Sequence, residues 1–161
     1  MAPLIILIVV TLVLALAGAA GVRWLRPWPM AVRGGVAAMF TATGISHFVG
    51  MRQQLIDMVP PALPAPALLV TVTGVLELAG AVGVLWPRTA PWAAAGLTAM
   101  LVLMFPANVY AVQSGVLTAW DDQIVPRTLM QVVFLAATLT VFVHARRGDQ
   151  ARLNRPAHSR S

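Results

Sequence analysis

The sequence predicts an all-α protein, a polytopic bundle of transmembrane helices. Hydrophobic residues make up 59% of the 161 residues and charged residues only 10%, and the mean hydropathy is +0.82. Soluble domains carry about 25% charged residues. Long segments with almost no charge alternate with short stretches rich in proline or charge. We therefore expect one transmembrane domain of five helices, residues 1–145, followed by a basic tail, residues 146–161.

The first segment, residues 3–22, is a run of uncharged residues about long enough to cross ~30 Å of hydrocarbon as a helix. A cleaved signal peptide is the alternative. The segment lacks a basic start and its apolar part is longer than usual for a signal, so we expect a retained helix. The stretch 23–29 then combines arginine, tryptophan and proline, which is typical of an interface loop.

The second and third spans are expected at about 34–50 and 67–86. Small residues recur every four positions along the second span, which lets another helix approach closely; they are Gly34, Ala38, Ala42, Ser46 and Gly50. A stiff proline-rich connector, residues 60–66, separates the two spans. In the third span Thr73, Glu77 and Gly80 lie close to one helix face.

The fourth and fifth spans are expected at about 92–112 and 127–144. Pro106 lies inside the fourth span and predicts a kink there. The loop between these spans holds Asp121 and Asp122. After the fifth span the chain is polar and rich in arginine, which predicts a disordered tail.

The arginines predict the orientation of the bundle. If the N-terminus is outside, nine of the eleven basic residues fall on the inner side, and Arg52 and Arg127 are the exceptions. Cytoplasmic loops carry an excess of basic residues. We therefore expect a multi-pass protein of the bacterial inner membrane with its N-terminus outside and its C-terminus in the cytoplasm.

Glu77 is the strongest candidate for a functional residue. It is the only carboxylate inside a long apolar segment, where an ionisable side chain costs ~3 kcal/mol and usually faces a protein interior or a wet cavity. In the predicted topology His47, Asn108 and Gln131 share the outer half of the membrane with Glu77. This match in depth predicts one polar cluster.

Such a cluster favours proton chemistry. Glu77 and His47 are the candidate catalytic residues, because a carboxyl and an imidazole can exchange a proton near neutral pH. Asn108, Gln131 and Thr73 are the candidate substrate-binding residues, with the two amides suited to orienting a carbonyl or hydroxyl group. The structural alternative is that these groups only form hydrogen bonds between helices.

Metal and thiol chemistry are not expected. The chain has no cysteine, which excludes a disulfide or an iron–sulfur cluster within it. His47 and His144 lie most of a bilayer apart in the predicted topology, so one haem cannot take both. One histidine and one glutamate are too few for a zinc site. The tail arginines are expected to serve topology and anionic lipid, not nucleic acid.

A short pattern occurs twice. Thr43-Gly44-x-x-His47 and Thr73-Gly74-x-x-Glu77 are thirty residues apart. A duplicated helix pair would explain the pattern, although so few matched positions also arise by chance.

Several motifs together resemble the DoxX-like family of small bacterial membrane proteins. They are Gly44-Ile45-Ser46-His47-Phe48, Val59-Pro60-Pro61-Ala62-Leu63-Pro64, Thr73-Gly74-Val75-Leu76-Glu77-Leu78, Pro87-Arg88 and Phe105-Pro106-Ala107-Asn108-Val109-Tyr110. The resemblance runs from about Phe40 to Phe142. It implies a core of four membrane helices, to which the first helix is an addition. It also implies an association with quinone-linked, thiol-redox or oxidative-stress systems, although the missing cysteines leave any sulfur chemistry to a partner.

Three functions remain open from the sequence. The first is a membrane partner of a redox system, with a quinone as the possible cofactor. The second is an acid–base enzyme, an isomerase, lyase or cyclase, that acts on an apolar substrate from the lipid. The third is a scaffold without catalytic activity.

Overall fold

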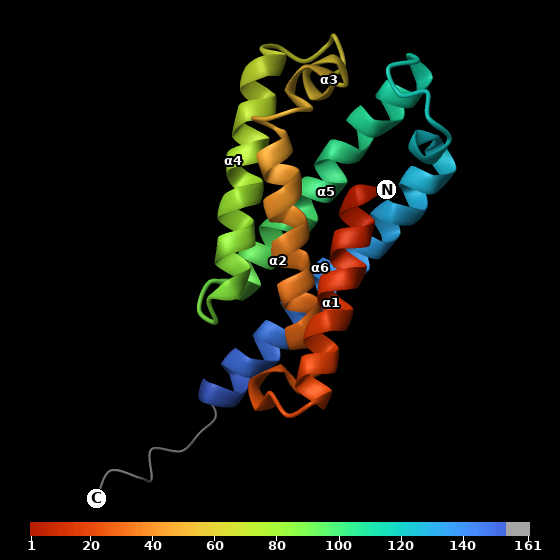
Figure 1. The fold of residues 1–161 in the computed structure, drawn as a ribbon. Coiled ribbons are helices and arrows are strands. Elements are labelled where there is room, and N and C mark those ends of the chain that lie inside the picture. The colour runs from red at the N-terminus through yellow and green to blue at the C-terminus, as the bar shows by residue number, and fades with distance from the viewer. Residues whose placement is uncertain (154–161) are drawn as a thin grey trace, which may run out of the picture.

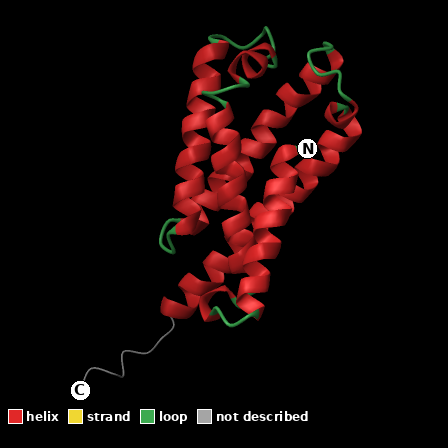
Figure 2. Cartoon of the chain, in the orientation of Figure 1, coloured by secondary structure: helices red, strands yellow, loops and turns green. Residues whose placement is uncertain are grey.

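The computed structural model describes residues 1–153, and it confirms the all-α prediction. Six α-helices follow one another along the chain with two short 3-10 turns, and loops join them (Figures 1 and 2). The helices are α1 (Ala2–Ala19), α2 (Trp28–Ser46), α3 (Arg52–Asp57), α4 (Pro66–Leu85), α5 (Ala90–Gln113) and α6 (Ile124–Leu153). The 3-10 turns are η1 (Arg23–Leu25) and η2 (Trp120–Asp122).

Within the described residues, four helices are long and apolar enough to cross a membrane. They are α1, α4, α5 and the part of α6 from Ile124 to Gly148. The chain is thus a polytopic membrane protein. Helix α2 falls below the same hydropathy because it contains Arg33 and many glycine, alanine and threonine residues. It contacts α1, α4 and α6, so much of its surface faces protein instead of lipid.

Proline defines where the long helices start. Helices α1, α2, α4 and α5 each have a proline in the first turn, at Pro3, Pro29, Pro66 and Pro91. The first N–H groups of a helix have no partner within it, so proline costs little there and its fixed φ favours the helix. Pro106 is different because it lies inside α5.

Two predicted boundaries were wrong. The expected connector 23–29 is shorter, because α2 already begins at Trp28, and α2 ends at Ser46 instead of residue 50. Gly50 adopts a positive φ of 78° in the turn that follows, a conformation that suits glycine. In the expected disordered tail, α6 continues to Leu153; the last tail residues, 154–161, lie outside the described part of the chain.

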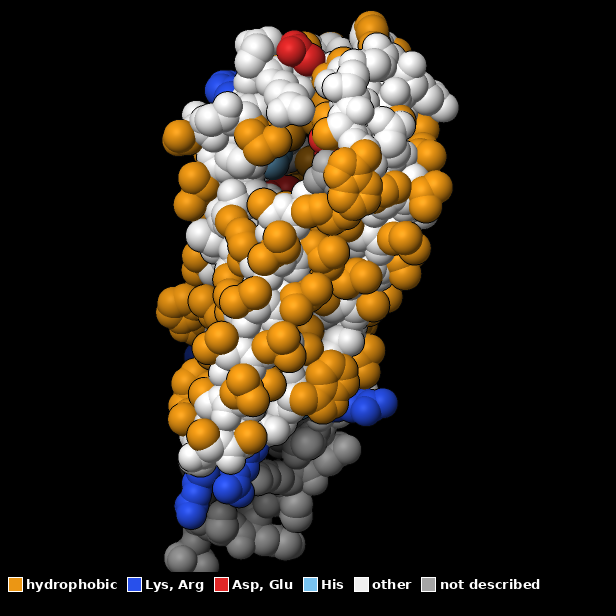
Figure 3. All heavy atoms as spheres, turned by 45° about the vertical axis from the view of Figure 1, so that its right-hand side comes forward, with side chains coloured by type: hydrophobic (Ala, Val, Ile, Leu, Met, Phe, Trp, Pro, Cys, Tyr) orange, Lys and Arg blue, Asp and Glu red, His pale blue; other side chains and the backbone are white. Residues whose placement is uncertain are grey.

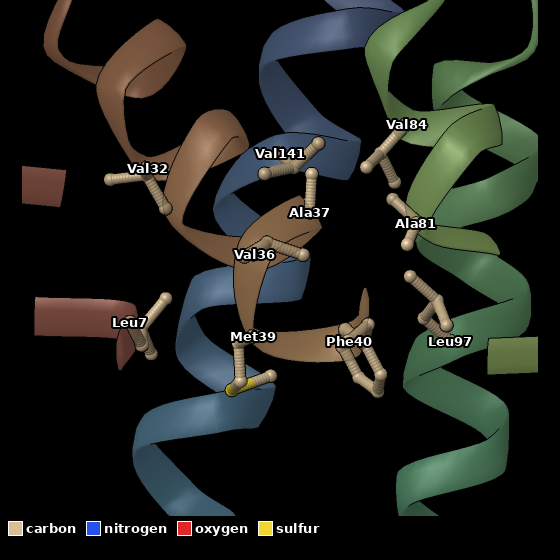
Figure 4. Packing of buried hydrophobic residues seen from close by; sticks show 11 residues of the cluster. Leu7, Val32, Val36, Ala37, Met39, Phe40, Ala81, Val84, Leu97 and Val141 are labelled. Atoms are coloured by element: carbon tan, nitrogen blue, oxygen red, sulfur yellow. The ribbon is translucent and has the colours of Figure 1, made fainter. Parts of the chain in front are cut away.

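The helices form two antiparallel pairs that meet in one core. Helix α2 packs against α4, and α5 packs against α6, while α1 lies along α2 (Figure 1). Figure 4 shows the shared core between these helices. Its buried members are Leu7, Val32, Val36, Ala37, Met39, Phe40, Ala81, Val84, Ala94, Leu97 and Val141. Seven of these eleven belong to α2 and α4.

A second, smaller apolar cluster lies at the end of the bundle that carries α3, here called the α3 end. Met58, Ala111 and Leu117 are buried there, with Leu55, Val112 and Val116 packed against them. Leu55 and Met58 come from the α3 region, and the others come from the end of α5 and the following loop. The two helix pairs are therefore joined at the α3 end as well as in the main core.

Candidate functional site

Glu77 and His47, which the sequence placed only in the same half of the membrane, lie side by side. Both are buried, with 5% and 3% of their surface exposed. The His47 Nδ1 atom is 4.0 Å from the Glu77 Oε2 atom and 2.9 Å from the carbonyl oxygen of Thr43. Because a carbonyl only accepts, Nδ1 carries a hydrogen and donates it to Thr43. The distance to Glu77 exceeds a hydrogen bond, so the two side chains are neighbours without a direct hydrogen bond.

The Glu77 carboxyl is only partly satisfied. Thr43 is a side-chain hydrogen-bond partner of this carboxyl, but Oε2 is buried and has no hydrogen-bond partner among the described residues. An unpaired buried polar atom costs about 1–3 kcal/mol. The carboxyl therefore keeps one buried position at which another group could bind.

Two glycines allow this close approach of α2 and α4. A Cβ atom on Gly74 would lie 2.5 Å from the Cβ of His47, and one on Gly44 would lie 3.3 Å from the Cβ of Glu77. The two Thr-Gly patterns in the sequence thus face each other across antiparallel helices. Each glycine provides the space for the ionisable residue of the other pattern.

The other predicted site residues form hydrogen bonds within or between helices. The Thr73 hydroxyl donates within its own helix, at 2.9 Å from the Leu69 carbonyl and 3.1 Å from the Val70 carbonyl. Gln131 Nε2 donates to the Leu101 carbonyl at 2.6 Å and so links α6 to α5. Asn108 Oδ1 accepts from Arg127 Nη1 at 2.6 Å. His47 thus lies beside Glu77 and Asn108 binds Arg127, and among the described residues no hydrogen bond or ion pair links these two pairs.

Arg127 was missed as a site residue. Its Nη2 atom donates to Asp122 Oδ1 at 2.8 Å, while its Nε atom is buried and has no hydrogen-bond partner among the described residues. From the sequence, Arg127 contributed only to the predicted orientation of the bundle in the membrane. Its position in the first turn of the fifth span, facing an asparagine at the same depth, was the signal that could have identified it.

The two polar pairs belong to different pairs of helices, His47 and Glu77 to α2 and α4, and Asn108 and Arg127 to α5 and α6. Figure 1 shows α2 and α4 separating from α5 and α6 toward the α3 end. The space-filling view shows the surface hollowed there, with histidine and carboxylate atoms visible inside (Figure 3). Apolar side chains cover the surface below it (Figure 3). This hollow is the candidate functional site.

Two other grooves lie away from these residues. One, of about 450 Å³, runs between α5 and α6 and is lined by apolar side chains with Thr98. The second, of about 370 Å³, lies between the start of α2 and α6, beside Trp28, His144 and Arg147. Neither is lined by a predicted site residue. Among the described residues, no three histidine, aspartate or glutamate side chains gather as a metal site requires.

Comparison with known proteins gives a family without a described activity. No curated protein and no solved structure matches the chain significantly. A family model matches residues 36–142, from α2 to α6, and leaves α1 outside the match. The chain belongs to this family, which is described as a domain of unknown function (DUF8561).

Proposed function

We propose that this membrane protein binds an apolar molecule with a carbonyl or hydroxyl head group, of the quinone type, in the hollow at the α3 end. The observation that carries the proposal is the Glu77 Oε2 atom, which is buried inside a membrane-spanning helix and has no partner among the described residues. Ionisable groups at such depth are functional by default. A ligand hydroxyl donating to this oxygen, or a protonated Glu77 donating to a ligand carbonyl, would satisfy it.

Glu77 would be the group that exchanges a proton with the ligand. His47 would act on Glu77 through its charge, because its Nδ1 hydrogen is held by the Thr43 carbonyl and its distance to Oε2 is 4.0 Å.

The hydrogen bonds of Asn108, Gln131 and Thr73 would hold the helices around the site in place. The amides of Asn108 and Gln131 link α5 to α6, which holds these two helices in register. Thr73 lies one turn from Glu77 on α4 and binds its own helix. These residues would therefore shape the site through the backbone and other side chains.

A redox role follows from the resemblance to the DoxX-like family, which implies association with quinone-linked or oxidative-stress systems. The two electrons that convert a quinone to a quinol would come from a partner redox protein, since the chain contains no cysteine and no cofactor is implied by its residues. Reduction also takes up two protons: Glu77 would supply the proton at one ligand oxygen, and water would supply the proton at the other; oxidation of the quinol would return both by the same routes. The chain would thus serve as the membrane subunit that binds the quinone.

The orientation of the site follows the arginines. Basic side chains gather at the end opposite α3 (Figure 3), which is the side expected to face the cytoplasm. With the N-terminus outside and α2 as a fifth span, the hollow would lie in the outer half of the bacterial inner membrane. Apolar molecules would enter it from the lipid.

Binding of a short-chain quinone to the purified protein tests this function. Tryptophan quenching by a decyl-substituted 1,4-benzoquinone should saturate for the wild type and fail to saturate for Glu77→Gln. The matched control is Gln53→Glu, on the short helix α3 at the surface, which should bind as the wild type does. Equal binding by the wild type and Glu77→Gln would show that the Glu77 carboxyl does not bind the quinone. Turnover of an apolar substrate without any partner protein would favour an isomerase, lyase or cyclase instead.

A further inference from the structure

We infer that Arg127 is a second binding residue of the hollow and that the ligand head is held at two points. This inference rests on the proposed function, because it assigns the opposite end of the same ligand. Glu77 would bind one oxygen of the head group and the Arg127 Nε–H would donate to the other. The ligand class is then an apolar ring with oxygens on opposite sides, as in a 1,4-quinone or its quinol.

The hydrogen bonds of Arg127 leave its Nε–H unpaired in a defined direction. The guanidinium is planar and presents its donors in a rigid fork. Two of its nitrogens already bind Asn108, at 2.6 Å, and Asp122, at 2.8 Å. These contacts fix the plane of the group, and the buried Nε atom has no partner among the described residues. The Nε–H is therefore oriented before any ligand arrives.

The charge around Arg127 favours a neutral acceptor. Asp122 neutralises the guanidinium through a direct ion pair. A second anion at Nε would meet a pair whose net charge is already zero, and it would lose its own hydration on burial. A carbonyl oxygen costs less to bury and can accept the N–H. The chemistry of this position therefore selects a carbonyl over a carboxylate or phosphate.

The depths of Glu77 and Arg127 suit a small head group. Leu97 on α5 lies against Gly80 on α4, so these two residues are level. Glu77 is three residues nearer the α3 end than Gly80, about 4.5 Å along the helix. On α5, Leu101 lies about 6 Å nearer the α3 end than Leu97, and the Gln131 amide of α6 binds at the level of Leu101. Arg127 lies one turn further along α6, which adds about 6 Å. Arg127 therefore begins roughly 7–8 Å nearer the α3 end than Glu77.

Glu77 belongs to the α2–α4 pair of helices and Arg127 to the α5–α6 pair, and these pairs separate toward the α3 end (Figure 1). The apolar cluster of Leu55, Met58 and Ala111 joins them again at that end. A ring bound between Glu77 and Arg127 would thus lie under this cluster, with its apolar tail free to extend toward the lipid.

Calorimetric titration of the purified protein with two probes tests the inference. The probes are a decyl-substituted 1,4-benzoquinone and a decyl-substituted cyclohexenone, which keeps a single carbonyl. Since a hydrogen bond to a charged group is worth about a factor of ten or more in affinity, the wild type should bind the benzoquinone at least that much more tightly. Arg127→Lys, which keeps the charge but lacks the planar fork, should lower benzoquinone affinity to the cyclohexenone level and leave cyclohexenone binding unchanged.

The controls separate this inference from the proposed function. Arg88→Lys makes the same exchange in the exposed turn at the opposite end and should preserve the preference for benzoquinone. Equal binding of the two probes by the wild type would overturn the inference even if Arg127→Lys folded poorly. A folded Arg127→Lys variant that still prefers benzoquinone to cyclohexenone would also overturn the inference. Loss of binding in Glu77→Gln would, in that case, still support the proposed function. A wild type that binds neither probe would contradict both.

Discussion

Gly44 on α2 and Gly74 on α4 occupy equivalent positions in two facing Thr-Gly patterns, and each borders the ionisable residue of the other. A Cβ on Gly74 would approach the His47 Cβ to 2.5 Å, and one on Gly44 would approach the Glu77 Cβ to 3.3 Å. Real side-chain atoms do not tolerate the shorter distance. The separation of His47 and Glu77 thus depends on the absence of two methyl groups.

Gly74→Ala should destabilise the bundle because the new methyl group meets the His47 ring. Overpacking of this kind typically costs about 1–3 kcal/mol. Chemical unfolding in detergent, followed by helix content, measures the change. Gly96→Ala is the matched control, since a Cβ there meets nothing within 4 Å; it should be neutral or slightly stabilising because alanine favours the helix. Equal stability of the two variants would show that α2 and α4 do not approach as described.

Glu77→Gln should keep or raise the stability of the protein while it removes the binding of ligand. Glutamine has nearly the same shape, and it replaces a buried ionisable group whose Oε2 atom has no partner by a neutral one. The gain in the free energy of unfolding should be about 1 kcal/mol. Thermal unfolding of ligand-free protein measures it. A marked loss of stability would instead assign Glu77 a packing role, as a scaffold requires.

The contact between α5 and α6 can be tested by cross-linking, because the natural chain contains no cysteine. The hydroxyl oxygens of Thr98 and Thr138 are 2.9 Å apart. Thr98→Cys combined with Thr138→Cys should therefore form a disulfide on mild oxidation, which peptide mass spectrometry detects. Thr98→Cys combined with Thr41→Cys, where Thr41 is exposed on α2, should stay reduced within the monomer. Equal cross-linking of both pairs would contradict the arrangement of the helices.

Single cysteines also test the proposed orientation. Ser114→Cys lies after α5 at the α3 end, and Thr89→Cys lies in the turn before α5 at the opposite end. A maleimide that cannot cross membranes should label Ser114→Cys in intact spheroplasts and Thr89→Cys only after permeabilisation. The reverse pattern would place the α3 end and its hollow on the cytoplasmic side.

The sequence predicted the bounds of α4 well and the contacts between helices poorly. The third span was expected at residues 67–86 and α4 runs from Pro66 to Leu85, because apolar length and flanking proline are local signals. The sequence placed His47 and Glu77 in the same half of the membrane but did not show whether they lie close together; in the structure Nδ1 and Oε2 are 4.0 Å apart. The rotation of each helix about its axis is set by packing, so the link from Arg127 to Asn108 did not follow from spacing alone.

The binding partners of the arginines were the contacts that the sequence predicted least. Arg33 and Arg127 were counted only as topological charges. Arg33 is buried and its Nε atom donates to the Val84 carbonyl in the last turn of α4, a position where a cation satisfies free carbonyl groups. Charge bias predicts the side of the membrane but contains no information about which backbone or side chain a guanidinium will bind.

The most direct test of the central claim is extraction and mass spectrometry of the small molecules that copurify with the protein from its native membrane. Wild type, Glu77→Gln and Gly96→Ala would be compared at equal purity and lipid content. The account predicts a quinone or related carbonyl compound bound to the wild type and to Gly96→Ala, and absent from Glu77→Gln. The same compound retained by Glu77→Gln, or found in none of the three, would contradict Glu77 as a ligand-binding residue.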